Sequence, residues 1–335
     1  MNFALSELGY RGKMKITVIS GGVGGARFLR GLREHTRAAL PDAEITAIVN
    51  TGDDMWLSGL RIAPDLDSIM YTLAGENDEI RGWGRVGESE RVSAELRAYG
   101  VGWPWFALGD LDIGTHIART SFLRDGLTLT EATARITARW PLGVTLLPVT
   151  DDEVETHVVV DEAGTTLHFQ EWWTRHRASM GARAFVQQNV ASARPAPGVL
   201  EQIAAADVIL VAPSNPVVSI GTVLDIPGIR GALAAASAPI VGVSPIINGS
   251  VVRGMADACL AAIGVETTAS AVATHYGARS QGGLLDAWLV DVSDAECIPG
   301  LLAAGLRARA VPLWMSDVPT SAQLAADALS LMHEG

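Results

Sequence analysis

Four carboxylates stand close together early in the chain. Asp53 and Asp54 follow an uncharged, β-branched stretch, and Asp65 and Asp67 follow Pro64. Carboxylates placed side by side repel one another unless a cation or hydrogen-bond donors balance them, and magnesium takes one or two carboxylates together with water and phosphate oxygens. The pattern favours a Mg²⁺ site. Helix caps and Asx turns use the same residue types, so this segment alone leaves a structural role open.

A glycine-rich turn precedes these carboxylates and contains Gly21, Gly22, Gly24 and Gly25. Glycine adopts positive φ angles, and it lets backbone N–H groups approach a phosphate at the start of the following helix. The turn matches neither the dinucleotide fingerprint nor the Walker A pattern, so it does not name a cofactor. A tight strand-to-helix turn without a ligand is the alternative interpretation.

A third polar segment, residues 108–116, contains Asp110, Thr115 and His116. His116 could bind a phosphate or orient a carboxylate, and a buried structural role is the competing interpretation.

Two polar loops follow apolar strands in the second half of the chain. Ser and Asn between prolines form a rigid loop that presents donors to a base or a phosphate, although an ordinary proline turn has the same composition. The loop residues that we single out are Ser214, Asn215, Pro216, Ser219 and, after the next strand, Ser244.

An aromatic and basic segment, residues 169–177, contains Trp172, Trp173 and Arg175. Paired tryptophans beside arginines could stack on a flat ring system or close over an anion. Hydrophobic packing explains the tryptophans equally well.

The elements that would position these segments alternate between strands and helices. Apolar runs at 14–19, 45–50, 208–212, 240–244, 285–290 and 308–313 predict buried strands, and helical stretches, including 251–263, separate most of them. This alternation predicts an α/β fold with a doubly wound, mostly parallel, Rossmann-like sheet, whose ligands collect at the carboxyl ends of the strands.

The domain organisation expected from the sequence has three parts. Residues 1–13 form a flexible leader, residues 14–130 and 201–335 form a Rossmann-like nucleotide-binding core, and residues 131–200 form a smaller α+β insertion. Alternating patterns at 154–160 and 165–169 predict an antiparallel pair within the insertion.

Composition limits the classes of partner. The formal net charge of −12 argues against a nucleic-acid surface, because such a surface needs a basic face. The longest uncharged run, residues 231–252, contains prolines and glycines and reads as helix end, strand and loop rather than a membrane span. Two isolated cysteines indicate neither a disulfide framework nor a zinc site. We expect a cytoplasmic protein without nucleic-acid or membrane partners.

Taken together, these segments closely resemble the 2-phospho-L-lactate transferase family. The similarity extends over nearly the whole chain from Met14, and the loop GGVGGARFL is similar to the bacterial branch. The segments that carry the resemblance are KITVISGGVGGARFLRGL (15–32), IVNTGDDMWLSGLRIAPDLDSIMYTLAG (48–75), WFALGDLDIGTHIART (105–120), HFQEWW (168–173), VAPSNPVVSIG (211–221) and VGVSPIING (241–249).

The resemblance implies a transferase of coenzyme F420 biosynthesis. The terminal ribityl hydroxyl of the deazaflavin Fo would attack the phosphate that carries a three-carbon acid and expel GMP. In the bacterial branch the implied donor is enolpyruvyl-diphospho-guanosine, which yields dehydro-F420-0. The lactyl analogue of the archaeal branch yields F420-0.

This reaction leads to expected roles for the residues. Asp53, Asp54 and Asp65 would serve Mg²⁺ and the ribityl hydroxyl, and one carboxylate would accept its proton. Gly22, Gly24, Ser214, Asn215 and Ser219 would hold the guanosine diphosphate part, and Trp172, Trp173 and Arg175 would border the deazaflavin or close the site. The remaining expected ligand-binding residues are Gly21, Gly25, Asp110, Thr115, His116, Pro216 and Ser244.

Two other functions fit parts of the pattern. A nucleotide-sugar-binding regulator of a related fold would need the glycine turn but not a deazaflavin pocket. A dinucleotide oxidoreductase fits the fold class but lacks its glycine fingerprint. We expect a homodimer, the commonest symmetric assembly.

Overall fold

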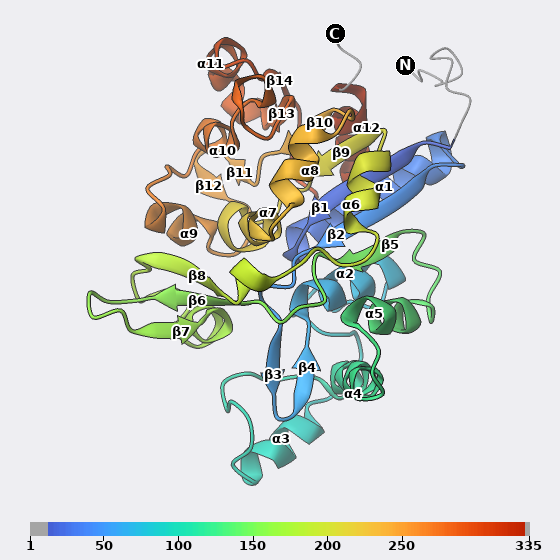
Figure 1. Ribbon diagram of the computed structural model, residues 1–335, viewed down its shortest axis with the longest axis vertical. Coiled ribbons are helices and arrows are strands. Elements are labelled where there is room, and N and C mark those ends of the chain that lie inside the picture. The colour runs from blue at the N-terminus through green and yellow to red at the C-terminus, as the bar shows by residue number, and fades with distance from the viewer. Residues whose placement is uncertain (1–12, 332–335) are drawn as a thin grey trace.

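The computed structural model describes residues 13–331, so all but the last residue of the expected leader lies outside the described part. Its centre is a seven-stranded sheet in the order β14-β13-β10-β9-β1-β2-β5, and every neighbouring pair is parallel (Figure 1). The strands are β1 (Lys15–Ser20), β2 (Glu44–Val49), β5 (Thr145–Pro148), β9 (Val208–Val211), β10 (Ile240–Val243), β13 (Ala287–Val290) and β14 (Arg307–Ala310).

The strand order reverses direction at β1. From β1 the chain adds β2 and β5 on one side, and β9, β10, β13 and β14 on the other. Loops after β1 and β9 therefore leave the same sheet edge in opposite directions, which opens a crevice between them. The expected doubly wound α/β fold is confirmed.

Alternating side chains of each strand enter two hydrophobic layers. Ile16 and Val18 of β1 join one layer, whereas Ile19 joins the other. This alternation explains why the central strands read as continuous apolar runs. The first layer is covered by α1 (Gly22–Ala39), α2 (Pro64–Ala74), α5 (Leu129–Thr137) and α12 (Val318–Leu331); the second by α6 (Val199–Ala205), α7 (Thr222–Asp225), α8 (Ile229–Ala235), α9 (Ala256–Ala262), α10 (Ala269–Tyr276) and α11 (Ile298–Ala303).

Two smaller parts extend from the sheet edge that carries the crevice (Figure 1). A hairpin of β3 (Met55–Leu57) and β4 (Leu60–Ile62) reaches toward α3 (Arg91–Ala98) and α4 (Asp110–Arg124). A three-stranded antiparallel sheet contains β6 (Glu155–Val159), β7 (Thr166–His168) and β8 (Ala184–Gln188). A π-helical turn, η2 (Glu171–Arg175), lies between β7 and β8 in the chain.

The expected antiparallel pair is present as β6 and β7. Within the expected insertion, β5 pairs with β2 of the main sheet, and α5 packs on the first layer, so the antiparallel sheet itself covers only residues 155–188. The division into domains stays a prediction.

The stretch expected to be helical at 251–263 begins differently. Val251 belongs to a short hairpin of β11 (Ile246–Ile247) and β12 (Ser250–Val251), and α9 starts only at Ala256. Gly254 has a φ of +82°, which interrupts a right-handed helix. Within residues 13–331 no single helix is long and apolar enough to cross a membrane; Pro216–Asp225 and Ile229–Ala235 meet the criterion only as a pair bent by 84°.

Candidate functional site

A cavity of about 560 Å³ lies at the carboxyl ends of β1, β9 and β10. The loop after β1 contributes Gly21, Gly22 and Gly24, and the loop after β9 contributes Ser214 and Asn215. Further parts of the wall come from α2, α4, the small antiparallel sheet with its π-helical turn, and the loop after β12. The cavity therefore occupies the topological switch point of the sheet, where open α/β folds bind their ligands.

The glycine turn packs directly on the loop after β9. Gly21 donates its backbone N–H to Ser214 Oγ at 3.1 Å, and this hydroxyl donates to the Gly21 carbonyl at 2.7 Å. A Cβ at position 24 would lie 2.2 Å from the Pro213 carbonyl oxygen, and Gly22 has a φ of +59°. A side chain at position 24 would push the two loops apart, and the positive φ at position 22 favours glycine there. Gly25 lies behind the cavity wall, against Ser20 and Ser214.

Asp53 and Asp65 line this cavity together with the glycine turn. Asp65 accepts a hydrogen bond from Asn50 Nδ2 at 2.9 Å, and its Oδ2 would lie 2.6 Å from a Cβ at position 21. Burial raises the pKa of Asp65 to about 6. Burial, followed by the charges of Asp65 and Asp54, raises the pKa of Asp53. Two buried carboxylates with raised pKa values indicate a site that a cation would stabilise.

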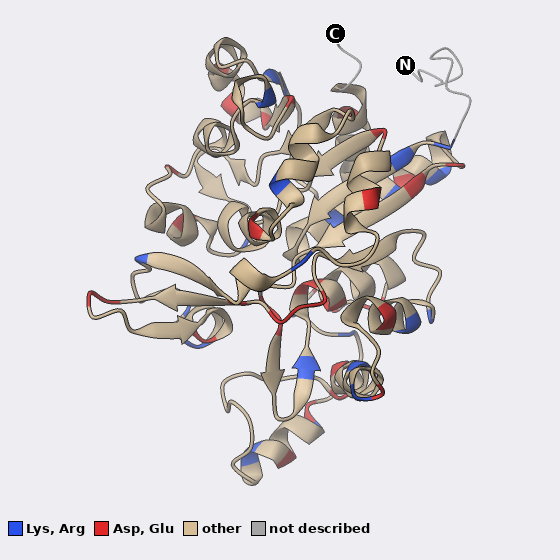
Figure 2. Cartoon of the chain, in the orientation of Figure 1, with Lys and Arg blue, Asp and Glu red and all other residues tan. Residues whose placement is uncertain are grey.

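Asp54 does not line the cavity. Its side chain is fully buried, and Oδ2 lies 3.6 Å from Arg61 Nη2. Burial raises its pKa to about 7, although Arg61 and Arg119 act in the opposite direction. Figure 2 shows acidic segments gathered at the end of β3 that lies nearest the main sheet, and Asp53 and Asp54 directly precede β3 in the chain. Asp54 thus acts on the cavity indirectly, through its charge beside Asp53, Asp65 and Asp67.

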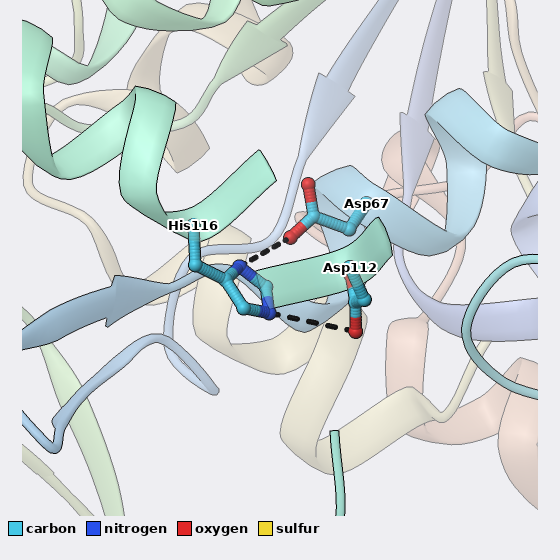
Figure 3. A group of neighbouring side chains, drawn as sticks. All are labelled: Asp67, Asp112 and His116. Atoms are coloured by element: carbon cyan, nitrogen blue, oxygen red, sulfur yellow. Dashed lines mark ion pairs between the residues drawn. The ribbon is translucent and has the colours of Figure 1, made fainter. Parts of the chain in front are cut away.

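A second acidic group, Asp67 and Asp112 with His116, lies in the same wall (Figure 3). His116 places Nδ1 3.5 Å from Asp67 Oδ2 and Nε2 3.5 Å from Asp112 Oδ2. Arg119 binds both carboxylate oxygens of Asp67, and its Nη1 lies 3.2 Å from His116 Nδ1. Tyr71 donates to Asp112 at 2.7 Å. One ligand atom from each of Asp67, Asp112 and His116 lies within 4.8 Å of the others, a spacing that a metal ion could bridge.

The two carboxylate groups differ in how well they fit Mg²⁺. In the group of Asp67, Asp112 and His116, the Arg119 guanidinium already neutralises Asp67 and would repel a cation. Among the described residues, Asp53 Oδ1 is buried without any hydrogen-bond partner. An orphaned carboxylate oxygen beside a second carboxylate is the donor type that Mg²⁺ prefers, so Asp53 and Asp65 fit the ion better.

Several expected site residues meet at the cavity, and others do not. The structure brings His116, Trp173, Ser219 and Ser244 to the wall, together with the residues described above. The wall does not include Asp110, whose carboxylate accepts hydrogen bonds from Ser89 and the Val92 backbone, or Trp172, which is fully buried in the small sheet. It also omits Thr115, Arg175 and Pro216. The site assignment itself stays a prediction.

The sequence interpretation missed an aromatic and basic part of the wall. Trp105 and Phe106 line the cavity, and Trp105 stacks on Trp103 with ring centroids 4.7 Å apart. The three aromatic residues within 103–106 were a signal for a flat binding surface, but their side-chain direction depends on the loop that carries them. The other missed residues in the wall include Arg27, Tyr71, Arg81, Trp83, Arg253 and Trp314.

The fold and the cavity define a doubly wound α/β protein with a cavity at the switch point of its sheet. A family model described as "2-phospho-L-lactate transferase CofD" matches residues 16–302. The chain belongs to this family and is a transferase.

Curated relatives support this membership over almost the full chain. A protein of Streptomyces griseus is 56% identical over 96% of this chain and 99% of its own, and one of Nocardia farcinica is 52% identical over 95% and 94%. Both are named phosphoenolpyruvate transferase. A solved structure of a UPF0052 family member from Bacillus halodurans, 18% identical, covers 96% of this chain and all of its own with a TM-score of 0.63, which shows the fold.

Proposed function

We propose that this chain transfers the phosphoenolpyruvyl group from enolpyruvyl-diphospho-guanosine to the terminal ribityl hydroxyl of Fo. The products are dehydro-F420-0 and GMP, and the lactyl analogue of the donor would give F420-0. The family and the names of its relatives support the transfer. The observation that carries the proposal is that Asp53 and Asp65 face the same cavity as the glycine turn, so nucleotide and alcohol can meet at buried carboxylates.

The transfer is a single in-line displacement at phosphorus. The ribityl oxygen forms a bond to the phosphorus that carries the three-carbon acid, and the bond from that phosphorus to the GMP oxygen breaks. The hydroxyl proton passes to a carboxylate of the Asp53–Asp65 pair, whose side chains line the cavity. The chain needs no covalent intermediate, because such reactions depend mainly on positioning and charge neutralisation.

Asp53 and Asp65 would hold Mg²⁺, with Asp54 behind them. When bound, the ion supplies neutralisation of the charge that develops on the phosphoryl oxygens. Backbone N–H groups of the glycine turn, at the start of α1, would bind the diphosphate, and Ser214, Ser219 and Ser244 would provide hydroxyl groups around it. Trp173, Trp105 and Phe106 offer flat apolar surfaces for the deazaflavin ring.

A direct assay tests this function. Purified protein is incubated with Fo, Mg²⁺ and either the enolpyruvyl or the lactyl donor, and the products are identified by mass spectrometry. We expect dehydro-F420-0 and GMP from the enolpyruvyl donor, with less product from the lactyl donor. Binding of the donor without any transfer to Fo would instead favour a nucleotide-sugar-binding regulator and would refute the proposal.

The proposal includes the assembly and location expected from the sequence. We infer a cytoplasmic homodimer, supported by composition and by the common occurrence of two-fold symmetric enzymes.

A further inference from the structure

Two arginine side chains of the cavity wall have no acidic partner among the residues that the structure describes. Arg27 is on α1 just after the glycine turn, and Arg253 is in the loop after β12. Within residues 13–331 neither guanidinium donates a hydrogen bond or forms an ion pair within 4.0 Å. A third arginine of the wall, Arg81, differs because it pairs with Glu90 at 2.8 Å and stacks on Trp83. The unpaired arginines therefore keep their hydrogen-bonding capacity for a ligand.

The two guanidinium groups converge from segments far apart in the chain. Burial and then the charge of Arg253 lower the pKa of Arg27, so the groups are close enough to repel. Arg253 lies against the backbone of Gly82, where an added Cβ would be 1.7 Å from Nη2. The acid with the largest opposing effect on Arg27 is Glu79, but Arg30 binds it at 2.6 Å.

The wall thus has two regions of opposite charge. Asp53 and Asp65 lie beside the glycine turn, whereas Arg27 and Arg253 lie where the turn of residues 81–84 meets the loop of residues 252–255. Adjacent arginines without carboxylates are unfavourable unless an anion joins them, and planar guanidinium groups bind oxyanions through paired N–H donors. A ligand with one phosphate near the carboxylates and a second anionic group at the arginines would complement both regions.

We propose that Arg27 and Arg253 form an oxyanion subsite that binds the second anionic group of the donor, either its outer phosphate or the carboxylate of its three-carbon acid. This inference rests on the proposed function for the identity of the donor. The subsite would fix the acid end of the donor while the glycine turn holds the nucleotide end. It would also distinguish the donor from GMP, which lacks both groups, and so favour release of that product.

Binding measurements test the subsite without turnover. Arg27→Gln and Arg253→Gln are titrated by calorimetry with GMP, GDP and the enolpyruvyl donor in the presence of Mg²⁺. Arg37→Gln is the matched control, because it removes the same charge from an exposed position on the same helix α1. We expect each cavity variant to bind the enolpyruvyl donor about tenfold to a hundredfold more weakly than the wild-type protein does, the usual effect of losing a charge-assisted hydrogen bond. Arg27→Lys should recover part of this loss, since it retains the charge but not the planar fork.

The pattern of losses identifies the bound group. Weaker binding of both GDP and donor, with GMP unchanged, assigns the arginines to the outer phosphate; weaker binding of the donor alone assigns them to the carboxylate. Unchanged affinity for all three ligands, or an equal weakening of GMP binding, overturns the subsite.

The subsite and the proposed function can fail separately. If the wild-type protein binds GDP but transfers nothing to Fo, the proposed function fails while these comparisons still decide the subsite. If it binds no guanosine ligand, pyrophosphate is titrated instead, and an affinity independent of both arginines overturns the inference.

Discussion

Two adjacent tryptophans in the small sheet have different surroundings. Trp172 is fully buried, donates Nε1–H to the Met180 carbonyl at 2.7 Å, and packs edge to face on Phe185. Trp173 faces the cavity and lies against Gly254, where an added Cβ would be 2.8 Å from its ring. One residue therefore stabilises the small sheet, and its neighbour lines the cavity.

Alanine substitutions should separate these two roles. Trp172→Ala should lower the free energy of unfolding by about 3–5 kcal/mol, because it leaves a large cavity in a packed cluster. Trp173→Ala should change stability less and weaken binding of Fo. Urea unfolding and Fo titration measure the two effects, and equal losses of stability in both variants would contradict this division.

The residue types of the site could be predicted, but the direction of each side chain could not. Asp53 and Asp54 are adjacent and chemically identical, yet only Asp53 faces the cavity, because β3 begins at Met55 and turns Asp54 toward Arg61. Asp110 and His116 share one motif, but they lie on different faces of α4. Such choices depend on neighbours distant in the sequence, which local pattern does not contain.

At the scale of elements, the approach of α1 to the loop after β9 shapes the cavity. Gly24→Ala should force the Pro213 carbonyl away and cost about 1–3 kcal/mol of stability, together with weaker GDP binding. The matched control is Gly231→Ala in α8, where an added Cβ meets nothing within 4 Å and should stabilise the helix by about 0.5–1 kcal/mol. Chemical unfolding and GDP titration provide the comparison; full GDP affinity in Gly24→Ala would exclude a role for this contact in binding.

The end of β7 contains a partly buried histidine, His168, whose protonation should link stability to pH. Burial, with the nearby charges of His157 and Arg61, lowers the pKa of His168 to about 4. The unfolded chain binds this proton with an ordinary pKa of 6.5, so the unfolded state holds more protons between these values. Stability should fall as pH decreases from 6.5 to 4, by at most about 3 kcal/mol from this residue.

His168→Gln should reduce that acid sensitivity. The measurement compares free energies of unfolding near neutral pH and near pH 4 for both proteins. A variant with the same pH dependence as the wild-type protein would show that His168 does not contribute.

The strands and most helices could be predicted because their signals are local. Apolar runs predicted each strand of the main sheet except β5, within a few residues, and Thr128 with Glu131 forms a capping box at the start of α5. The start of α9 was harder to predict from the sequence, because the residues before it form β12, which exists only through its pairing with β11.

At the scale of the whole molecule, the order of the sheet explains why distant segments meet. Residues near positions 21, 53, 116, 214 and 253 share one cavity, because the chain adds strands to both sides of β1 and returns its loops to one edge. The net charge of −12 does not prevent anion binding there, since backbone donors and the arginines of the wall face the cavity.

The transfer rate of Asp65→Asn at saturating Mg²⁺ tests the central claim most directly. The substitution preserves size and removes one charge beside the glycine turn. We expect the rate to fall by about a hundredfold or more, the scale of a lost electrostatic group, while thermal unfolding shows an intact fold. Turnover equal to that of the wild-type protein would contradict the assignment of the chemistry to these carboxylates.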